Sequence, residues 1–101
     1  MFMGNAQMLL ERSEIQVKAG LEEAFDGVMA EQGLPLLTAV PGVKWAKIGR
    51  GVENPTKFIF LVEWDSLASH KAFNESPAHP EFLKLFGPYA EGGVMEHFQI
   101  R

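Results

Sequence analysis

Cysteine is absent from the sequence. This excludes a disulfide framework, a thiolate nucleophile and a sulfur-ligated metal, and it is compatible with a reducing compartment such as the cytoplasm. Basic residues are also scarce, with nine Lys and Arg against 13 Asp and Glu, for a net charge of −4. Because nucleic acids and anionic membrane surfaces are bound through clustered cations, and the nine here are scattered, we expect neither as a partner.

Long apolar runs are missing too. No segment approaches the roughly 18 apolar residues of a membrane span. The opening MFMGNAQMLL lacks the basic start of a signal peptide. The glycines do not form a dinucleotide fingerprint, since the GRG at residues 49–51 precedes a hairpin rather than a helix. These absences favour a cytoplasmic protein without a nucleotide cofactor of that kind.

The three histidines show none of the local spacings of metal sites. Neither HxH nor HExxH occurs. Glu96 and His97 are neighbours on an expected strand and would therefore point to opposite faces. The spacing therefore predicts no metal site.

The length of 101 residues and the hydrophobic fraction of 47% suit a single domain over residues 1–101 with a substantial core. Hydrophobic periodicity predicts strands and helices in alternation. Strands are expected at residues 8–17, 43–50, 57–64 and 94–100. One helical segment is expected at residues 21–33, ending near Gly33, and a short one at 34–37, with Pro35 in its first turn. Another follows a cap at Asp65 or Ser66. The last is expected to run from Pro77 or Pro80 to about Gly87-Pro88.

The order β-α-β-β-α-β predicts a ferredoxin-like α+β fold, with two helices on one face of a four-stranded antiparallel sheet. The strand at residues 57–64 is apolar on both faces: Phe58 and Phe60 alternate with Ile59 and Leu61. Helices cover only one face, and several large apolar side chains left in water would cost several kcal/mol at roughly 25 cal/mol per Å². We therefore predict a homodimer that pairs sheet face to sheet face.

Four segments carry a resemblance to a known family: PLLTAVPGV (35–43), VENP (52–55), FIFLVEWDSLASHKAFNESP (58–77) and VMEHF (94–98). From about Met8 to Phe98 the chain resembles the antibiotic biosynthesis monooxygenases, which are dimeric α+β barrel proteins. That fold also hosts haem-degrading enzymes, lactone isomerases and proteins without known activity. The tryptophan and axial histidine of the haem-degrading members would fall on Phe73 and Leu83, so we do not expect haem degradation.

The resemblance implies a cofactor-independent monooxygenase for an aromatic or quinone-type small molecule, in which the substrate anion passes an electron to O₂ without flavin or metal. Two alternatives stay open. One is a non-catalytic dimeric module that binds a small ligand or accompanies a pathway enzyme. The other is an isomerase or lyase on the same fold.

His70 is the candidate base, because it shares a helical stripe with Leu67 and Phe73 that should face the sheet, and imidazole titrates near neutral pH. The alternative is a half-buried histidine bonded to a backbone carbonyl. The candidate substrate-binding residues are Trp64, Trp45, Phe73, His97 and Tyr89. Either tryptophan could stack on an aromatic ring or simply pack in the core.

Three further polar residues carry predictions of their own. Glu63 is expected to pair with Arg12 or Arg50, across strands or across the dimer, since a carboxylate in an apolar strand needs a partner; a catalytic role is the alternative. His79, in a proline-flanked turn, is expected to be exposed. His97 could reach either the pocket or the dimer seam.

Overall fold

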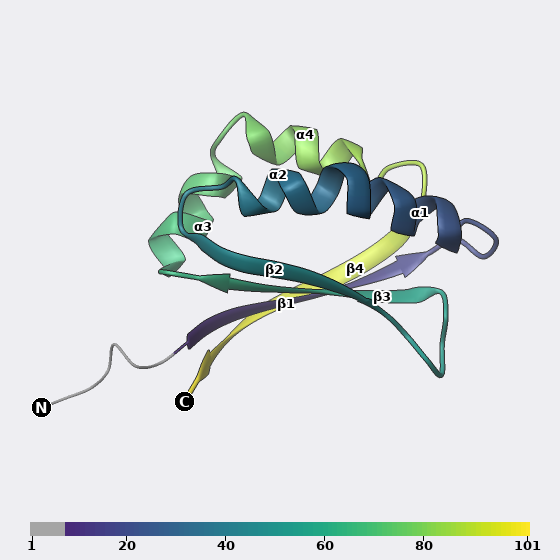
Figure 1. Ribbon diagram of the computed structural model, residues 1–101, viewed down its shortest axis with the longest axis horizontal. Coiled ribbons are helices and arrows are strands. Elements are labelled where there is room, and N and C mark those ends of the chain that lie inside the picture. The colour runs from purple at the N-terminus through teal and green to yellow at the C-terminus, as the bar shows by residue number, and fades with distance from the viewer. Residues whose placement is uncertain (1–7) are drawn as a thin grey trace, which may run out of the picture.

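The computed structural model describes residues 8–101, so most of the segment considered as a signal peptide, residues 1–7, lies outside the described residues. Within the described range the elements follow in the order β1 (Met8–Val17), α1 (Glu22–Val28), η2 (Met29–Gly33), α2 (Leu34–Thr38), β2 (Val43–Arg50), β3 (Lys57–Trp64), α3 (Leu67–Asn74), α4 (Ala78–Lys84) and β4 (Ala90–Ile100). The strands form an antiparallel sheet in the order β2-β3-β1-β4, and the helices lie together on one side of it (Figure 1). The predicted ferredoxin-like α+β fold is confirmed.

The core lies between the sheet and the helices. Alternate residues of β3, from Phe58 to Trp64, are at most 2% exposed and face the helices. Ile15 and Val17 of β1 lie on the same face, and Phe25 of α1 packs edge-on against Phe58 at a centroid distance of 4.9 Å. Period-two alternation in the strands thus places the large side chains under the helices, as their pattern predicts.

Gly33 does not end a helix, and that prediction is wrong. The chain passes from α1 through the π-helical turn η2 directly into α2, and Gly33 keeps a right-handed φ of −67°. A Cβ at Gly33 would lie 2.7 Å from the Sδ atom of the buried Met29, so the glycine makes room for that side chain. Pro35 has no N–H to donate to the preceding turn, and the widened turn lies just before it.

Strand β2 contains an irregularity that decides which way its tryptophan points. The register against β3 shifts between Val43, which lies opposite Trp64, and Trp45, which lies opposite Glu63. Directly opposed residues share a face, so Val43 faces the helices and Trp45 faces away from them. In a regular strand Val43 and Trp45, two residues apart, would share a face, so the shift overturns the simple alternation that the sequence predicts for residues 43–50.

Ser66 caps helix α3, where its Oγ accepts a hydrogen bond of 3.1 Å from the N–H of Ser69. Helix α4 begins at Ala78, directly after Pro77. Pro80 is tolerated in the first turn, because the first four N–H groups of a helix have no intrahelical acceptor. Of the two predicted starts, the one at Pro77 is therefore the correct one.

Strand β4 begins at Ala90, earlier than the predicted residue 94. Its glycines suggest a loop, yet Gly93 allows a close approach between strands. A Cβ there would lie 2.6 Å from the carbonyl oxygen of Glu14 on β1. The glycine is therefore part of the sheet and not of the turn that precedes it.

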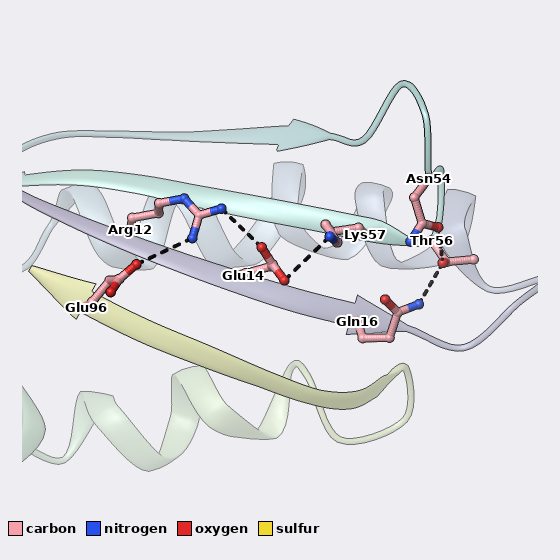
Figure 2. Close-up of polar contacts among 7 residues, drawn as sticks. All are labelled: Arg12, Glu14, Gln16, Asn54, Thr56, Lys57 and Glu96. Atoms are coloured by element: carbon pink, nitrogen blue, oxygen red, sulfur yellow. Dashed lines mark hydrogen bonds and ion pairs between the residues drawn. The ribbon is translucent and has the colours of Figure 1, made fainter.

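The face of the sheet opposite the helices carries a row of charges. Arg12 lies between two carboxylates, 3.1 Å from Glu14 and 3.7 Å from Glu96, and Glu14 also lies 3.7 Å from Lys57 (Figure 2). Within residues 8–101 no helix packs on this side. None of the helices in that range has the length and apolar character needed to cross a membrane. We call this surface the open face.

Candidate functional site

A cavity of about 520 Å³ lies between the sheet and the helices α3 and α4. Its wall is mainly apolar and aromatic, with Leu37, Phe60, Phe73, Phe82 and Phe86 among the lining residues. The polar groups along it include Glu11, Ser13, Asn74 and two histidines. Its volume falls within the roughly 300–1,000 Å³ of small-molecule pockets. An aromatic molecule of a few rings would find both space and stacking surfaces here.

Glu11 of β1 is held rigidly at one end of this cavity. Its Oε1 accepts a hydrogen bond of 2.9 Å from the indole Nε1 of Trp64, and its Oε2 accepts one of 2.6 Å from the hydroxyl of Ser13. The side chain is only 12% exposed. A carboxylate so nearly buried needs such donors, because desolvation without them would be costly.

Two imidazoles converge on the same carboxylate oxygen. The Nε2 of His70 lies 3.6 Å from Glu11 Oε1, and the Nε2 of His97 lies 4.0 Å from it. The two rings are 4.4 Å apart, centroid to centroid. His97 faces Glu11 directly across the β1–β4 ladder, whereas His70 descends from α3. We refer to these three residues as the Glu-His-His cluster.

The electrostatics of this cluster are set by burial. Desolvation lowers the pKa of His70 below its usual value, and the charges of His97 and His79 act in the same direction, while the Glu11 carboxylate opposes them. The imidazole of His70 is therefore mostly neutral at pH 7. The Nε2 of His97 is buried and has no hydrogen-bond partner among residues 8–101. Such an atom is unusual in a folded protein and marks a place where a further group would fit.

The structure brings several of the predicted site residues together. Trp64 packs edge-on against His70 at 5.2 Å between centroids, and its ring lies 6.0 Å from that of Phe73, which lines the cavity. His97 joins them from β4, on the helix-covered face. The expectation that His70 and Phe73 face the sheet is confirmed. It is wrong for Leu67, the third member of the predicted stripe, which is 58% exposed. The roles of these residues stay predictions.

Trp45 lies on the open face, away from the cavity. Its Nε1 donates a 2.6 Å hydrogen bond to Glu63, whose other carboxylate oxygen lies 3.5 Å from Lys44. Within the chain, the predicted pairing of Glu63 with Arg12 or Arg50 across strands is thus wrong. A pairing across the dimer stays a prediction. The irregularity in β2 brings Trp45 opposite Glu63, while the two arginines pair with other carboxylates.

Tyr89 and His79 also differ from expectation. Tyr89 packs against Phe25, at 6.1 Å between centroids, and is not among the residues that line this cavity. His79 is half-buried, lines the cavity and meets the ring of Phe73 edge-on at 5.3 Å. The prediction of an exposed His79 is wrong, because His79 lies in the first turn of helix α4 and its imidazole packs against Phe73 at the cavity.

Glu11 is the site residue that the sequence analysis did not select. A signal was present: Glu11 and Ser13 share a strand face with Leu9, Ile15 and Val17, so a carboxylate stands on a largely apolar strand face. That pattern indicates a partnered acid under the helices. The identity of its partners depends on the strand order, which local patterns do not contain.

These features define an α+β protein with a ferredoxin-like sheet and a ligand-sized cavity that ends at an acid and two imidazoles. The family model for antibiotic biosynthesis monooxygenase matches residues 8–85, and the chain belongs to this family. The resemblance carried by its sequence segments is thereby confirmed.

Three similar proteins match this chain over nearly their whole length. A solved structure from Bordetella bronchiseptica, provisionally assigned as an antibiotic biosynthesis monooxygenase, is 29% identical with a TM-score of 0.85, covering 94% of this chain and 98% of the other. The uncharacterized protein YczJ of Bacillus subtilis is 29% identical over 94 residues, 91% of this chain and 98% of its own length. A conserved protein of Methanosarcina mazei, at 15% identity and a TM-score of 0.81 over 100% of both chains, shares the fold.

Proposed function

We propose that this protein is a cofactor-independent monooxygenase that acts on an aromatic or quinone-type small molecule, with His70 as the base. The observation that carries the proposal is the apolar cavity of about 520 Å³ with the His70 imidazole in its wall. Family membership supports the reaction class.

The residues of the site suit the first step, removal of a proton from an acidic phenol or activated CH₂ group. His70 is mostly neutral because burial lowers its pKa, so its ring can accept a proton. The Glu11 carboxylate, 3.6 Å from His70 Nε2, then stabilises the imidazolium that forms. Phe73 and Phe82 provide aromatic surfaces against which a ring system can pack.

The remaining steps use the electrons of the substrate anion. The anion passes one electron to O₂, and the resulting radical pair combines to form a C–O bond. The hydroperoxide then loses its remaining C–H proton and breaks its O–O bond, leaving a carbonyl. In balance, CH₂ and O₂ give C=O and H₂O, and the proton held by His70 leaves with the water. The apolar wall keeps bulk water away from the reactive anion.

Oxygen uptake by chelator-treated protein with an anthrone-type substrate tests this reaction. We expect His70→Ala to lower kcat by about 100-fold or more, the usual contribution of a positioned base. His79→Ala is the matched control, since His79 lines the same cavity but lies outside the Glu-His-His cluster. Its effect should be confined to KM. Uptake that is unchanged in His70→Ala would refute the role of His70, and tight binding of the compound without uptake would favour the non-catalytic ligand-binding module.

We further propose that two chains pair through their open faces to form a dimeric α+β barrel. Half-buried or exposed apolar side chains lie on this face in β1, β3 and β4, namely Leu10, Ile59, Leu61, Val94, Phe98 and Ile100. The charges beside them are already paired within the chain, so burial would not leave Arg12 or Glu14 without a partner. Large apolar side chains gathered on one uncovered face usually mark an interface.

Light scattering after size-exclusion chromatography at micromolar concentration tests the pairing. The wild type should elute as a dimer, and Leu61→Glu, at the centre of the open face, should elute as a monomer. Leu67→Glu is the control, because Leu67 is 58% exposed on helix α3 on the other side of the molecule. A wild-type protein that stays monomeric at this concentration would contradict the proposal.

A further inference from the structure

We infer that the Glu-His-His cluster is a binding site for a divalent first-row transition-metal ion, such as Zn²⁺. Glu11, His70 and His97 each offer one ligand atom, and these three atoms lie within 4.8 Å of one another. Two imidazoles and one carboxylate form a donor set that suits zinc and its neighbours and disfavours Mg²⁺ and Ca²⁺, which prefer oxygen ligands.

The distances are close to those of a loaded site. Zinc bonds of 2.0–2.1 Å place neighbouring ligand atoms of a tetrahedral site about 3.4 Å apart. The two imidazole nitrogens lie 3.6 and 4.0 Å from Glu11 Oε1, which is too far for a hydrogen bond and slightly wider than a metal requires. Small side-chain rotations of His70 and His97 would close the site.

The state of His97 supports this inference independently. Its Nε2 is buried and has no hydrogen-bond partner among the described residues, although it points toward a carboxylate. An ion between His97 and Glu11 would satisfy that nitrogen, as would a single water molecule. An ion and a water molecule can be told apart, because only the binding of an ion depends on Glu11, His70 and His97 together.

The surroundings supply the outer shell that metal sites need. Trp64 Nε1 and Ser13 Oγ donate to the two oxygens of Glu11 and fix the orientation of its carboxylate. Both Glu11 and His70 line the cavity, so the remaining coordination position would face the space in which a small molecule binds. Three protein ligands and one open position are the arrangement of a site that can also hold a ligand.

Local spacing in the sequence does not reveal this cluster, because its members come from β1, α3 and β4. The inference goes beyond the proposed reaction, which uses no ion. An ion on His70 Nε2 would occupy the lone pair that accepts the substrate proton. Zinc should therefore suppress oxygen uptake by the metal-free protein, so that metal supply would switch the proposed activity off.

Isothermal titration of chelator-treated protein with Zn²⁺, in the absence of any substrate, tests the site. We expect one ion per chain. Glu11→Gln and His97→Asn should each weaken binding by more than about 10-fold, and Ser13→Ala by about 10-fold, as for other outer-shell groups. His79→Asn is the matched control and should bind as the wild type does. The absorption of bound Co²⁺ should report a low-coordinate nitrogen and oxygen site in the wild type and lose intensity in His97→Asn.

The inference would be overturned if the double variant Glu11→Gln/His97→Asn still bound zinc. It would also be overturned if His79→Asn weakened zinc binding as much as Glu11→Gln or His97→Asn does. A wild type without saturable binding would overturn it as well and would leave water as the occupant. Should a variant fail to fold, the wild type still decides: Zn²⁺ should raise its Tm through preferential binding to the native state, and Mg²⁺ should not. No substrate is used in these measurements, so their outcome does not depend on whether the proposed reaction takes place.

Discussion

The hydrogen bond from Trp64 to Glu11 should contribute measurably to stability, and a double-mutant cycle isolates it. Trp64 is 1% exposed and Glu11 Oε1 accepts its Nε1–H at 2.9 Å. A hydrogen bond to a charged group contributes about 1.5–3 kcal/mol, and the smaller ring of phenylalanine loses roughly a further 1 kcal/mol of burial. We expect Trp64→Phe to cost about 2.5–4 kcal/mol in total, or roughly 12–20 °C in Tm for a chain of this size.

The cycle combines Trp64→Phe with Glu11→Ala, and the free energy of unfolding is measured by urea denaturation with circular dichroism. Protein concentration is held constant, because dimerization would add to stability by mass action. The double variant should lose about 1.5–3 kcal/mol less free energy of unfolding than the two single losses add up to. A coupling below about 0.5 kcal/mol would refute the view that this bond anchors the carboxylate.

Two smaller changes test local features of the fold by thermal denaturation. Gly42→Ala should cost more than about 1 kcal/mol of stability, because Gly42 has a φ of +96° and a Cβ there would lie 2.4 Å from the Cβ of Ser69. The control is Gly27→Ala in helix α1. A Cβ at Gly27 meets open space, so this change should stabilise the helix by roughly 0.5–1 kcal/mol. Equal changes in stability for Gly42→Ala and Gly27→Ala would contradict this account of Gly42. Ser66→Ala should cost about 1 kcal/mol through loss of the α3 cap, whereas Ser66→Asn should retain most of the stability, and equal losses in both would rule out capping as the cause.

The fold followed from patterns that are local in the chain. Alternation in β3 predicted the strand and its two faces, and the predicted cap at Asp65 or Ser66 marked the start of α3, because these features depend on neighbouring residues alone. The errors arose where packing overrides local preference. Gly33 resembles a helix end, but its lack of a side chain serves the packing of Met29.

The candidate site was only partly predictable for a related reason. The spacing on α3 correctly directed His70 toward the sheet, where Trp64 meets it. The pairing of Glu11 with His97 arises from the β1–β4 register, which is fixed by the assembly of the whole sheet. Similarly, one shift in the β2 register turned Trp45 away from the cavity, and no residue type in that segment signals the shift.

The Glu-His-His cluster joins parts of the molecule that differ in how readily their backbones open. Glu11 lies on β1, whose amides are hydrogen-bonded within the sheet with strands on both sides, and His97 lies on the adjacent strand. His70 lies on α3, a helix of eight residues, too short to be stable on its own. Slow amide exchange should thus mark the floor of the site and faster exchange its wall. A metal ion bound at the cluster would slow hydrogen exchange mainly in α3. The exchange rates of this helix would therefore report binding at Glu11, although Glu11 itself lies in the rigid sheet.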